Sequence, residues 1–476
     1  MNKKLTRCLH SLLHAEYEEI TSNYHAKPPA PTNDYDSSRS NNRRTDFNDE
    51  YDSIILAWQF WRRRCIAILA TLPYITRIMI KSTLFIFLVW ALAIPPTAFA
   101  QNIVRLDKSN ITSYALDQKI RMLMKNANVS GLAISIFNNN KPVYKKTFGY
   151  KNLVTKKQIT STSNFYGASL SKAVFAVLVM KFVEEGLLDL DKPLQDYLPK
   201  PIFNYPTKTK WHDHYSDLQS DTLYKKITAR MCLSHTSGFP NWRSDEPDEK
   251  LRVKFKPGLK YSYSGEGLVY LQVVLEHMFN KSLEDLMASK IFSPLGMTMS
   301  SYKWQPRFER DYCVGHQSDG SLYEKDKDNE PRAASTLETN LDDYTKFTTA
   351  ILKNTVLRPT TTMEMFKAQV RIRSIQQFGP LRFRDSTTND GIDLSYGLGW
   401  GLLQSPHGVA AFKEGHGDGF QHYSILFPEA GIGIVIFCNS DNGESIFKEL
   451  LETAIADTFT PWYWENYIPY NLKRDR

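Results

Sequence analysis

The chain has 476 residues, more than a single hydrophobic core usually accommodates and enough for two lobes. Hydrophobic residues make up 42% of it and charged residues 23%, which is typical of a globular protein and excludes a largely disordered one. The net charge of +8 is spread without basic clusters interleaved with aromatic residues, so the sequence argues against nucleic acid as a partner.

An apolar segment with the features of an export signal lies unusually far from the N-terminus. Residues 79–100 combine a basic start, a short apolar run and an Ala-Phe-Ala exit, the three parts of a secretory signal peptide. Three interpretations of the polar and basic residues 1–78 stay open. Translation starts at Met79, or residues 79–100 are an uncleaved membrane anchor behind a cytoplasmic tail, or residues 1–78 are a genuine extra region. In the first two, residues 101–476 are exported to the periplasm or extracellular space, or remain anchored at the inner membrane.

The predicted elements after this segment begin with a helix and a hairpin. Residues 116–126 carry apolar side chains at helical spacing, which predicts an amphipathic helix. Residues 132–137 form an apolar, β-branched run, an Asn-Asn-Asn-Lys turn follows, and residues 143–148 return, which predicts a β-hairpin. A second helix is expected from Ser169. Because residues 173–180 are apolar on every side, this helix should be buried all round.

The middle of the chain is predicted to be helical and its end to return to strands. Residues 190–370 are rich in helical patterns and loops, whereas strands are expected at 399–403, 422–427 and 431–437, followed by a helix at 444–457. Strands at both ends with helices between them predict an α/β (α+β) fold of two lobes. One lobe is a sheet built from both ends of the chain and flanked by helices, and the other is helical. The cleft between them is the expected site.

The candidate nucleophile lies in a Ser-x-x-Lys motif, Ser169 to Lys172. The same pattern recurs at 300–303 and 445–448, but only Ser169 follows a Gly-Ala loop and opens an apolar helix. Its hydroxyl would lie at the positive end of the helix dipole, with Lys172 on the same helix face. A lysine in a dry site loses affinity for its own proton and can accept that of a serine. The alternative interpretation is an N-cap serine followed by a solvated lysine.

Longer stretches resemble the class C β-lactamase and D-alanyl-D-alanine peptidase family of serine hydrolases. Residues 116–188 resemble its N-terminal half, including a Phe-Gly-Tyr turn at 148–150. Leu-Ser-His-Thr-Ser-Gly at 233–238 and Tyr-Gly-Leu-Gly-Trp-Gly at 396–401 match further segments in the right order. The resemblance covers nearly all of 110–460. It implies a β-lactamase/transpeptidase-like fold for residues 101–476, with an antiparallel sheet, and an acyl-enzyme mechanism without metal or organic cofactor.

The resemblance also implies the remaining site residues. The family's Tyr-x-Asn motif corresponds to Tyr263-Ser264-Gly265, and Tyr263 beside a lysine ammonium would have its phenolate favoured and accept the Ser169 proton. The third motif, Lys-Thr-Gly or His-x-Gly on an edge strand, is expected at His416, which would face Ser169 and help to hold a substrate carboxylate. The backbone N–H groups of Ser169 and Gly419 are the expected oxyanion hole.

Two departures from the family pattern leave the substrate open. Gly265, which the resemblance places among the substrate-binding residues, lacks the amide that the family's Asn offers to a substrate's amide side chain, and Asp418 stands where Gly is usual. Hydrolysis of an ester, amide or peptide bond is expected, with esters or short peptides preferred over penicillins and His416 largely neutral at neutral pH. The alternatives are a β-lactamase or D-alanyl-D-alanine carboxypeptidase proper, and a non-hydrolysing penicillin-binding sensor. The partner is a small-molecule or peptide substrate; oligomeric state stays open, as does membrane attachment through residues 79–100.

Other candidate groups receive structural interpretations. His212-Asp213-His214 is interpreted as an exposed polar insertion rather than a metal site, and His235 as a structural loop histidine. No Gly-x-Ser-x-Gly elbow occurs, which argues against an α/β-hydrolase. The cysteines after residue 100 are expected to be packed thiols: Cys232, Cys313 and Cys438.

Overall fold

The computed structural model describes residues 102–472 except 211 and 328. The interpretations placed on residues 1–78 and 79–100 therefore fall outside the described residues. Within the described part, no helix is both long enough and apolar enough to cross a lipid bilayer.

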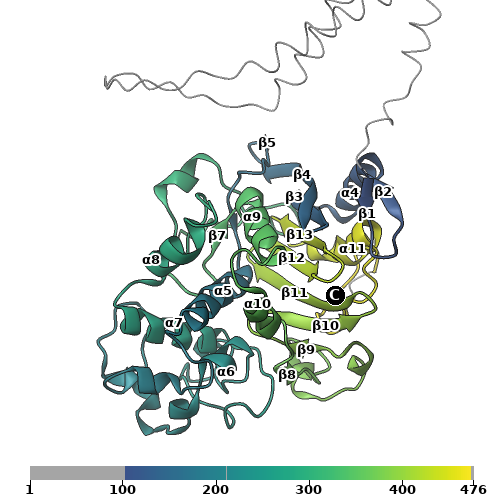
Figure 1. The fold of residues 1–476 in the computed structure, drawn as a ribbon. Helices are drawn as coiled ribbons and strands as arrows, with labels where there is room; N and C mark the ends of the chain where they lie inside the picture. The colour runs from purple at the N-terminus through teal and green to yellow at the C-terminus, as the bar shows by residue number, and fades with distance from the viewer. Residues whose placement is uncertain (1–101, 211, 328, 473–476) are drawn as a thin grey trace, which may run out of the picture. The chain divides into compact units, whose positions relative to one another are not determined.

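A nine-stranded antiparallel sheet forms the centre of the described residues, in the order β5-β4-β3-β13-β12-β11-β10-β9-β8 (Figure 1). The strands are β3 (Gly131–Asn138), β4 (Lys141–Asn152), β5 (Lys157–Gln158), β8 (Val370–Arg371), β9 (Ser395–Tyr396), β10 (Gly401–Ser405), β11 (Gly408–Gly417), β12 (Phe420–Phe427) and β13 (Ile432–Cys438). Strand β13 pairs with β3, so the two ends of the folded region meet in the middle of one sheet. This confirms the predicted fold class.

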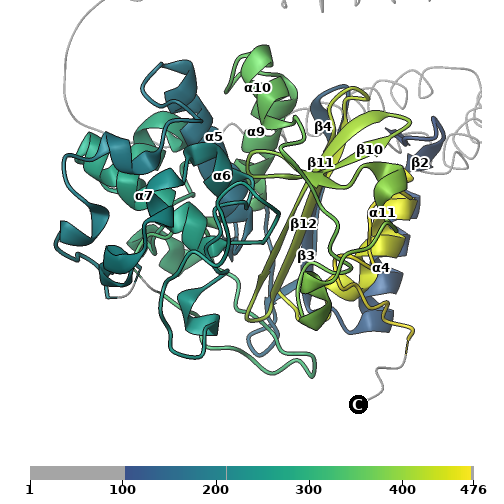
Figure 2. The same cartoon turned by 90° about the horizontal axis from the view of Figure 1, so that it is seen from below.

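Helices cover both faces of the sheet (Figure 2). Helices α4 and α11 lie on one face, and α5 and α9 lie on the other, where the helical lobe begins. The helices are α4 (Ser113–Ala127), α5 (Leu170–Glu184), α6 (Ala229–Leu233), α7 (Gly265–Phe279), α8 (Leu283–Met287), α9 (Leu341–Leu352), α10 (Pro359–Met365) and α11 (Phe447–Ile455). Two short strand pairs complete the fold: β1 (Asn102–Val104) with β2 (Asn110–Thr112), and β6 (Phe165–Tyr166) with β7 (Glu338–Thr339).

Strand periodicity divides the interior into two cores. In β13, Ile434 and Ile436 pack with the residues of α4 and α11, whereas Val435 and Phe437 pack with those of α5 and α9. Successive strand residues point to opposite faces, so an unbroken apolar strand requires cover on both sides. The buried sheet therefore gives α5 a fixed apolar surface on which to rest.

The predicted first helix, hairpin and buried helix are confirmed by α4, by β3 with β4, and by α5. Asn139 and Asn140 connect β3 to β4 with φ values of 49° and 60°, the left-handed conformation that a two-residue type I′ turn requires. One expectation is wrong. The Phe-Gly-Tyr segment at 148–150 is not a turn but lies inside β4, because Gly149 pairs with Gly131 and adopts φ 73° without leaving the sheet.

The segment that precedes β10 packs directly against α5. Gly399 adopts φ 87°, and its N–H donates to the carbonyl of Leu233 at 2.9 Å. A Cβ atom at residue 399 would lie 2.3 Å from the Cβ of Ala176 in α5. The absence of a side chain at residue 399 therefore sets how closely α5 approaches this part of the sheet.

We predict that Gly399→Ala destabilises the protein far more than Gly186→Ala. Gly186 also has a positive φ, 69°, but a Cβ there meets nothing within 4 Å. The Gly186 substitution should cost only the left-handed strain of about 1–2 kcal/mol. Gly399→Ala should add about 1–3 kcal/mol of overpacking. Urea unfolding of both variants measures the difference, and equal losses of stability would contradict this account of the contact.

Candidate active site

Ser169 lies at the end of a strained loop that is fixed by the helical lobe. The N–H of Gly167 donates to the carbonyl of Leu337 at 2.6 Å, and Ala168 adopts φ 47°, a conformation that costs a non-glycine residue about 1–3 kcal/mol. Ser169 occupies the N-cap position of α5, but its side chain makes no capping hydrogen bond. The interpretation of Ser169 as an ordinary N-cap serine is therefore wrong, and its half-buried hydroxyl is free for other contacts.

Lys172 is buried beside this hydroxyl. The residue is only 1% exposed. Its Nζ lies 2.9 Å from Ser169 Oγ and donates a hydrogen bond to the carbonyl of Ala334 at 2.7 Å. Burial lowers the pKa of Lys172 well below its ordinary value, and the Lys413 cation lowers it further, while the Glu414 carboxylate acts in the opposite direction. The alternative of a solvated lysine is therefore wrong: the structure places a buried amine with a lowered pKa beside the Ser169 hydroxyl.

The other two Ser-x-x-Lys motifs do not form this pair. Ser300 Oγ contacts Thr339 Oγ1 at 2.8 Å and donates to Asp343 at 3.1 Å. Ser445 donates to the carbonyl of Asn442 at 2.6 Å, while Lys448 forms an ion pair with a glutamate on its own helix. Only the motif at the start of α5 brings a buried lysine to its serine.

Tyr263 completes the group, with a different charge state from the one predicted. Its ring stacks on His235 with centroids 4.3 Å apart, and its ring centroid is 4.9 Å from Lys172 Nζ. Burial raises the pKa of Tyr263 well above its ordinary value, the Glu414 carboxylate adds to this, and the contact with the Ser169 hydroxyl opposes it. The expectation of a favoured phenolate is wrong, because burial and the Glu414 carboxylate both disfavour the phenolate and together outweigh the Ser169 contact. Tyr263 is a neutral phenol.

Sequence reasoning missed Lys413. This residue of β11 has a fully buried side chain whose Nζ donates to the Tyr263 hydroxyl at 3.2 Å and forms an ion pair with Glu414 at 2.8 Å. Burial raises the pKa of Glu414, but the Lys413 cation outweighs it and lowers this pKa to about 2. Lys413-Glu414-Gly415 thus supplies a Lys-x-Gly motif three residues before the expected one. A charged Lys-Glu pair inside the apolar run of β11 was the signal that could have revealed it.

His416 faces the same cavity as Ser169 but is engaged by a carboxylate. Its Nε2 lies 3.1 Å from Glu444 Oε1, and about a third of its side chain is exposed. Burial lowers the pKa of His416, but the Glu444 carboxylate outweighs it, so the net shift is upward from the ordinary value. The expectation of a largely neutral imidazole assumed an unperturbed pKa and left out Glu444, which comes from a segment 28 residues further along the chain.

The two glycines predicted to contact substrate are not available for it. The N–H of Gly419 donates to Asp441 Oδ1 at 3.0 Å in the turn after β11, so Gly419 does not form an oxyanion hole, which corrects that prediction. Gly265 begins α7, but a Cβ there would lie 2.7 Å from the Trp242 ring. The space beside Gly265 is filled by protein rather than open to substrate.

The edge of β11 beside the cavity is unpaired. Strand β10 pairs only with residues 408–412 of β11, whereas β12 pairs with β11 from 411 to 417. The described strands therefore leave one edge of residues 413–417 without a partner. Gly417 and Phe420 close a two-residue hairpin, so the alternation of antiparallel hydrogen bonding directs the N–H of His416 toward this edge.

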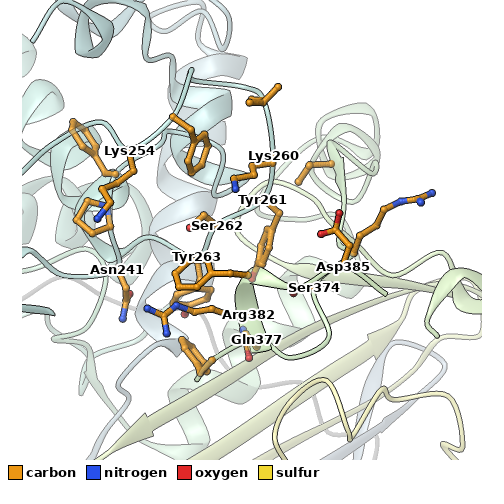
Figure 3. Close-up of a pocket in the computed structure, with 18 of the residues that line it drawn as sticks. Asn241, Lys254, Lys260, Tyr261, Ser262, Tyr263, Ser374, Gln377, Arg382 and Asp385 are labelled. Atoms are coloured by element: carbon orange, nitrogen blue, oxygen red, sulfur yellow. The ribbon is translucent and has the colours of Figure 1, made fainter. Parts of the chain in front are cut away.

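These side chains line a cavity of about 310 Å³. Its lining residues are Ser169, Lys172, Asn241, Trp242, Tyr263, Phe378, Glu414, His416, Glu444, Glu465 and Asn466. A second cavity of about 860 Å³ shares Asn241, Tyr263 and Phe378 with it. Figure 3 shows Asn241 and Tyr263 among the residues that line this larger cavity. The cavity at Ser169 and the larger cavity are therefore neighbours that share part of their walls.

The remaining candidates have structural surroundings. His235 is buried and its Nδ1 accepts from the N–H of Ser264 at 3.1 Å, as expected for a structural loop histidine. His212 is buried, so the expectation of an exposed insertion is wrong for this residue. Within residues 102–472, and apart from the two undescribed positions, no group of three or more potential ligands is arranged to hold a metal ion. The predicted packed thiols are all buried and free: Cys232, Cys313 and Cys438.

We predict that Lys172→Met removes activity and stabilises the protein at neutral pH. Loss of a base beside Ser169 should lower kcat/KM about 10²- to 10⁴-fold. The pKa of Lys172 is lower in the folded chain than its ordinary 10.5, so the unfolded chain binds more protons between these values and wild-type stability rises with pH there. The stability advantage of the variant should therefore shrink as pH rises toward 10. Urea unfolding across this range measures it, and a constant difference would contradict a buried neutral amine.

We predict that two further variants shift the acidic limb of the pH profile of kcat/KM in opposite directions. Lys413 lowers the pKa of Lys172 and Glu414 raises it. Lys413→Met should therefore move the limb of kcat/KM to higher pH, and Glu414→Gln should move it to lower pH. A pH series of kcat/KM for a neutral ester provides the measurement. Shifts in the same direction would show that Lys172 does not set the limb.

The chain is similar to known proteins in sequence and in fold. A family model described as Beta-lactamase matches residues 116–456. Protein flp of Staphylococcus aureus (strain N315) is 24% identical over 370 residues, which cover 73% of this chain and 68% of that protein. The structure of D-alanine carboxypeptidase AmpC from Burkholderia cenocepacia is similar with a TM-score of 0.54 and 21% identity, over 68% of this chain and 93% of that one.

A further solved structure with the same fold is described as EstCE1, a hydrolase with promiscuous acyltransferase activity. It is similar with a TM-score of 0.58 and 17% identity, over 72% of this chain and 97% of that one. The family match covers well over half of the chain and includes every residue of the Ser169 cavity except Glu465 and Asn466. The chain therefore belongs to the Beta-lactamase family.

Proposed function

We propose that the protein is a serine hydrolase that cleaves an ester, amide or peptide bond through an acyl-enzyme on Ser169. The observation that carries the proposal is the buried Lys172 amine 2.9 Å from the Ser169 hydroxyl. A serine hydroxyl becomes nucleophilic when a neighbouring base accepts its proton, and an amine whose pKa is lowered by burial is such a base at neutral pH.

In the first step, Ser169 Oγ bonds to the substrate carbonyl carbon while its proton passes to Lys172 Nζ. The carbonyl oxygen becomes an oxyanion, which the N–H groups of Ser169 and His416 would hold, since the N–H of His416 points to the unpaired edge of β11. His416 replaces Gly419 in this role, because the Gly419 N–H is bonded to Asp441. Pre-positioned backbone donors of this kind are usually the largest contribution to catalysis of acyl transfer.

In the second step, the tetrahedral intermediate collapses and the leaving oxygen or nitrogen takes a proton. Tyr263 is suited to donate it, because its phenol is neutral and contacts both the Ser169 hydroxyl and Lys413 Nζ. The proton held by Lys172 restores the phenol, leaving the acyl group on Ser169. A water molecule then attacks the acyl-enzyme ester, and one of its protons passes through the same groups to Ser169 Oγ. The acid is released and every group returns to its starting state.

The substrate proposed is an ester or a short peptide with an extended leaving group. Because Tyr263 protonates the leaving group, the leaving group lies on the Tyr263 side, where the cavity of about 860 Å³ begins. That space exceeds what a compact bicyclic β-lactam requires and suits a longer chain. The structural relatives described as a D-alanine carboxypeptidase and as a hydrolase with acyltransferase activity support the same reaction class. We further propose, from the signal-like residues 79–100, that the reaction takes place outside the cytoplasm.

We predict that Ser169→Ala abolishes covalent labelling of the full-length protein by a fluorophosphonate probe, while Ser300→Ala and Ser445→Ala do not. The two controls carry the same motif but contact Asp343 and the carbonyl of Asn442 instead of a lysine. Intact mass followed over time, with the fluorophosphonate and separately with a fluorescent penicillin, gives the readout.

The time course separates the alternatives. Turnover of esters with a transient acyl mass at Ser169 supports the hydrolase, and rapid release of penicillin from Ser169 favours a β-lactamase. A stable penicilloyl adduct without turnover of any ester would establish the non-hydrolysing sensor. Labelling that survives Ser169→Ala would overturn the assignment of the nucleophile.

A further inference from the structure

The acidic and basic side chains that line the Ser169 cavity leave no cation free for a substrate. These side chains are Lys172, Glu414, His416, Glu444 and Glu465. Glu414 is paired with Lys413 at 2.8 Å, and His416 with Glu444 at 3.1 Å. Burial lowers the pKa of Lys172 well below its ordinary value, and burial raises the pKa of Glu465 well above its own. Among the described residues, every cation favoured at this cavity therefore already faces a carboxylate of the chain.

The chain around Glu444 holds its carboxylate at His416. Glu444 begins a 3₁₀ helix, Glu444–Ile446, that leads into α11. The carbonyl of the next residue, Ser445, accepts hydrogen bonds from the Tyr467 hydroxyl at 2.8 Å and from the N–H of Tyr470 at 3.2 Å. The Glu444 side chain is only 26% exposed, so its pairing with His416 is less screened by water than that of a surface pair. The carboxylate is thus a built part of the cavity wall.

This pairing opposes the role that the sequence predicted for His416. A substrate carboxylate brought to His416 would share one imidazolium with Glu444, which leaves one net negative charge in a partly buried cavity. Like charges brought together in a binding site disfavour the ligand that introduces the second charge. The cavity measures about 310 Å³, so a carboxylate next to the scissile bond would have to lie within it. Glu444 therefore occupies the position that such a carboxylate would need.

We propose that Glu444 is a specificity-determining residue that excludes substrates with a carboxylate next to the scissile bond. The proposal rests on the proposed function and names the substrate class of the same site. The preferred substrates are neutral at this point, as esters of uncharged alcohols and peptide bonds within a chain are. A free C-terminal residue as leaving group, which a carboxypeptidase requires, carries the carboxylate that Glu444 opposes. The proposal thus separates this protein from a D-alanyl-D-alanine carboxypeptidase.

The test compares two thioesters that differ in one group, S-pentanoyl thioglycolate and S-pentanoyl thioglycolamide, on the full-length protein. Both release a thiol that a chromogenic disulfide reagent detects, but only the thioglycolate carries a carboxylate. Wild-type kcat/KM should be about 10- to 100-fold higher for the thioglycolamide because of repulsion by Glu444. Glu444→Gln removes the charge at nearly unchanged size and should bring the two values within about threefold of each other.

Two control variants separate this effect from other causes. Glu444→Asp keeps the carboxylate on a shorter side chain and should retain most of the preference for the thioglycolamide. Glu452→Gln removes the same charge from α11, where Glu452 is paired with Lys448 and does not line the cavity. In this second control the ratio of kcat/KM values for the two thioesters should match that of the wild type.

A preference for the thioglycolamide that is lost in Glu444→Gln and kept in both controls supports the proposal. Equal values in the wild type, a preference for the thioglycolate, a ratio unchanged in Glu444→Gln, or a ratio lost in either control would overturn it. In each of those cases, thiol release that Ser169→Ala abolishes leaves the proposed function standing. If Ser169→Ala releases thiol from both thioesters at the wild-type rate, the proposed function fails and this assignment fails with it.

Discussion

The site depends on the desolvation of a single amine. An isolated lysine prefers water and a proton, and removing it from water is costly unless it becomes neutral. Lys172 is nevertheless buried, because it belongs to α5, which is apolar on every side and lies in the interior. There its Nζ contacts the carbonyl of Ala334 and the hydroxyl of Ser169. Without that burial, the Ser169 hydroxyl would have a charged neighbour that cannot accept its proton.

The charges around the amine then determine how the other groups behave. Lys413 and Glu414 form a buried ion pair directly beside Tyr263, so the cation that disfavours protonation of Lys172 is compensated within the same strand. Burial keeps Tyr263 a neutral phenol, and the carboxylate of this pair adds to the effect. A neutral amine and a neutral phenol can exchange one proton with the substrate without leaving an unpaired charge in the cavity.

The proposed substrate specificity depends on chain segments that fill space at the site. The loop at 241–242 fills the position that a side chain at residue 265 would occupy, and the Trp242 ring at the same time shields the Lys172 amine. On the opposite wall, Glu444 engages His416, so an incoming substrate carboxylate would have to compete with a carboxylate already in place. Together with the large space beside Tyr263, these features support the proposal of an extended, uncharged acyl donor over a compact anionic one.

The sequence by itself determined the scaffold and the pair at its centre. The apolar run after Ser169 and the three-residue spacing to Lys172 are local properties, and strand periodicity at both ends of the chain was enough to predict the sheet. Only the tertiary structure decided that Lys413 contacts Tyr263, that the N–H of Gly419 donates to Asp441, and that Asn241 lies beside Gly265. Each of these contacts joins residues at least 22 positions apart, so a local sequence pattern cannot predict it. The desolvation of a side chain depends on all of its neighbours in space, so a local pattern cannot predict that either.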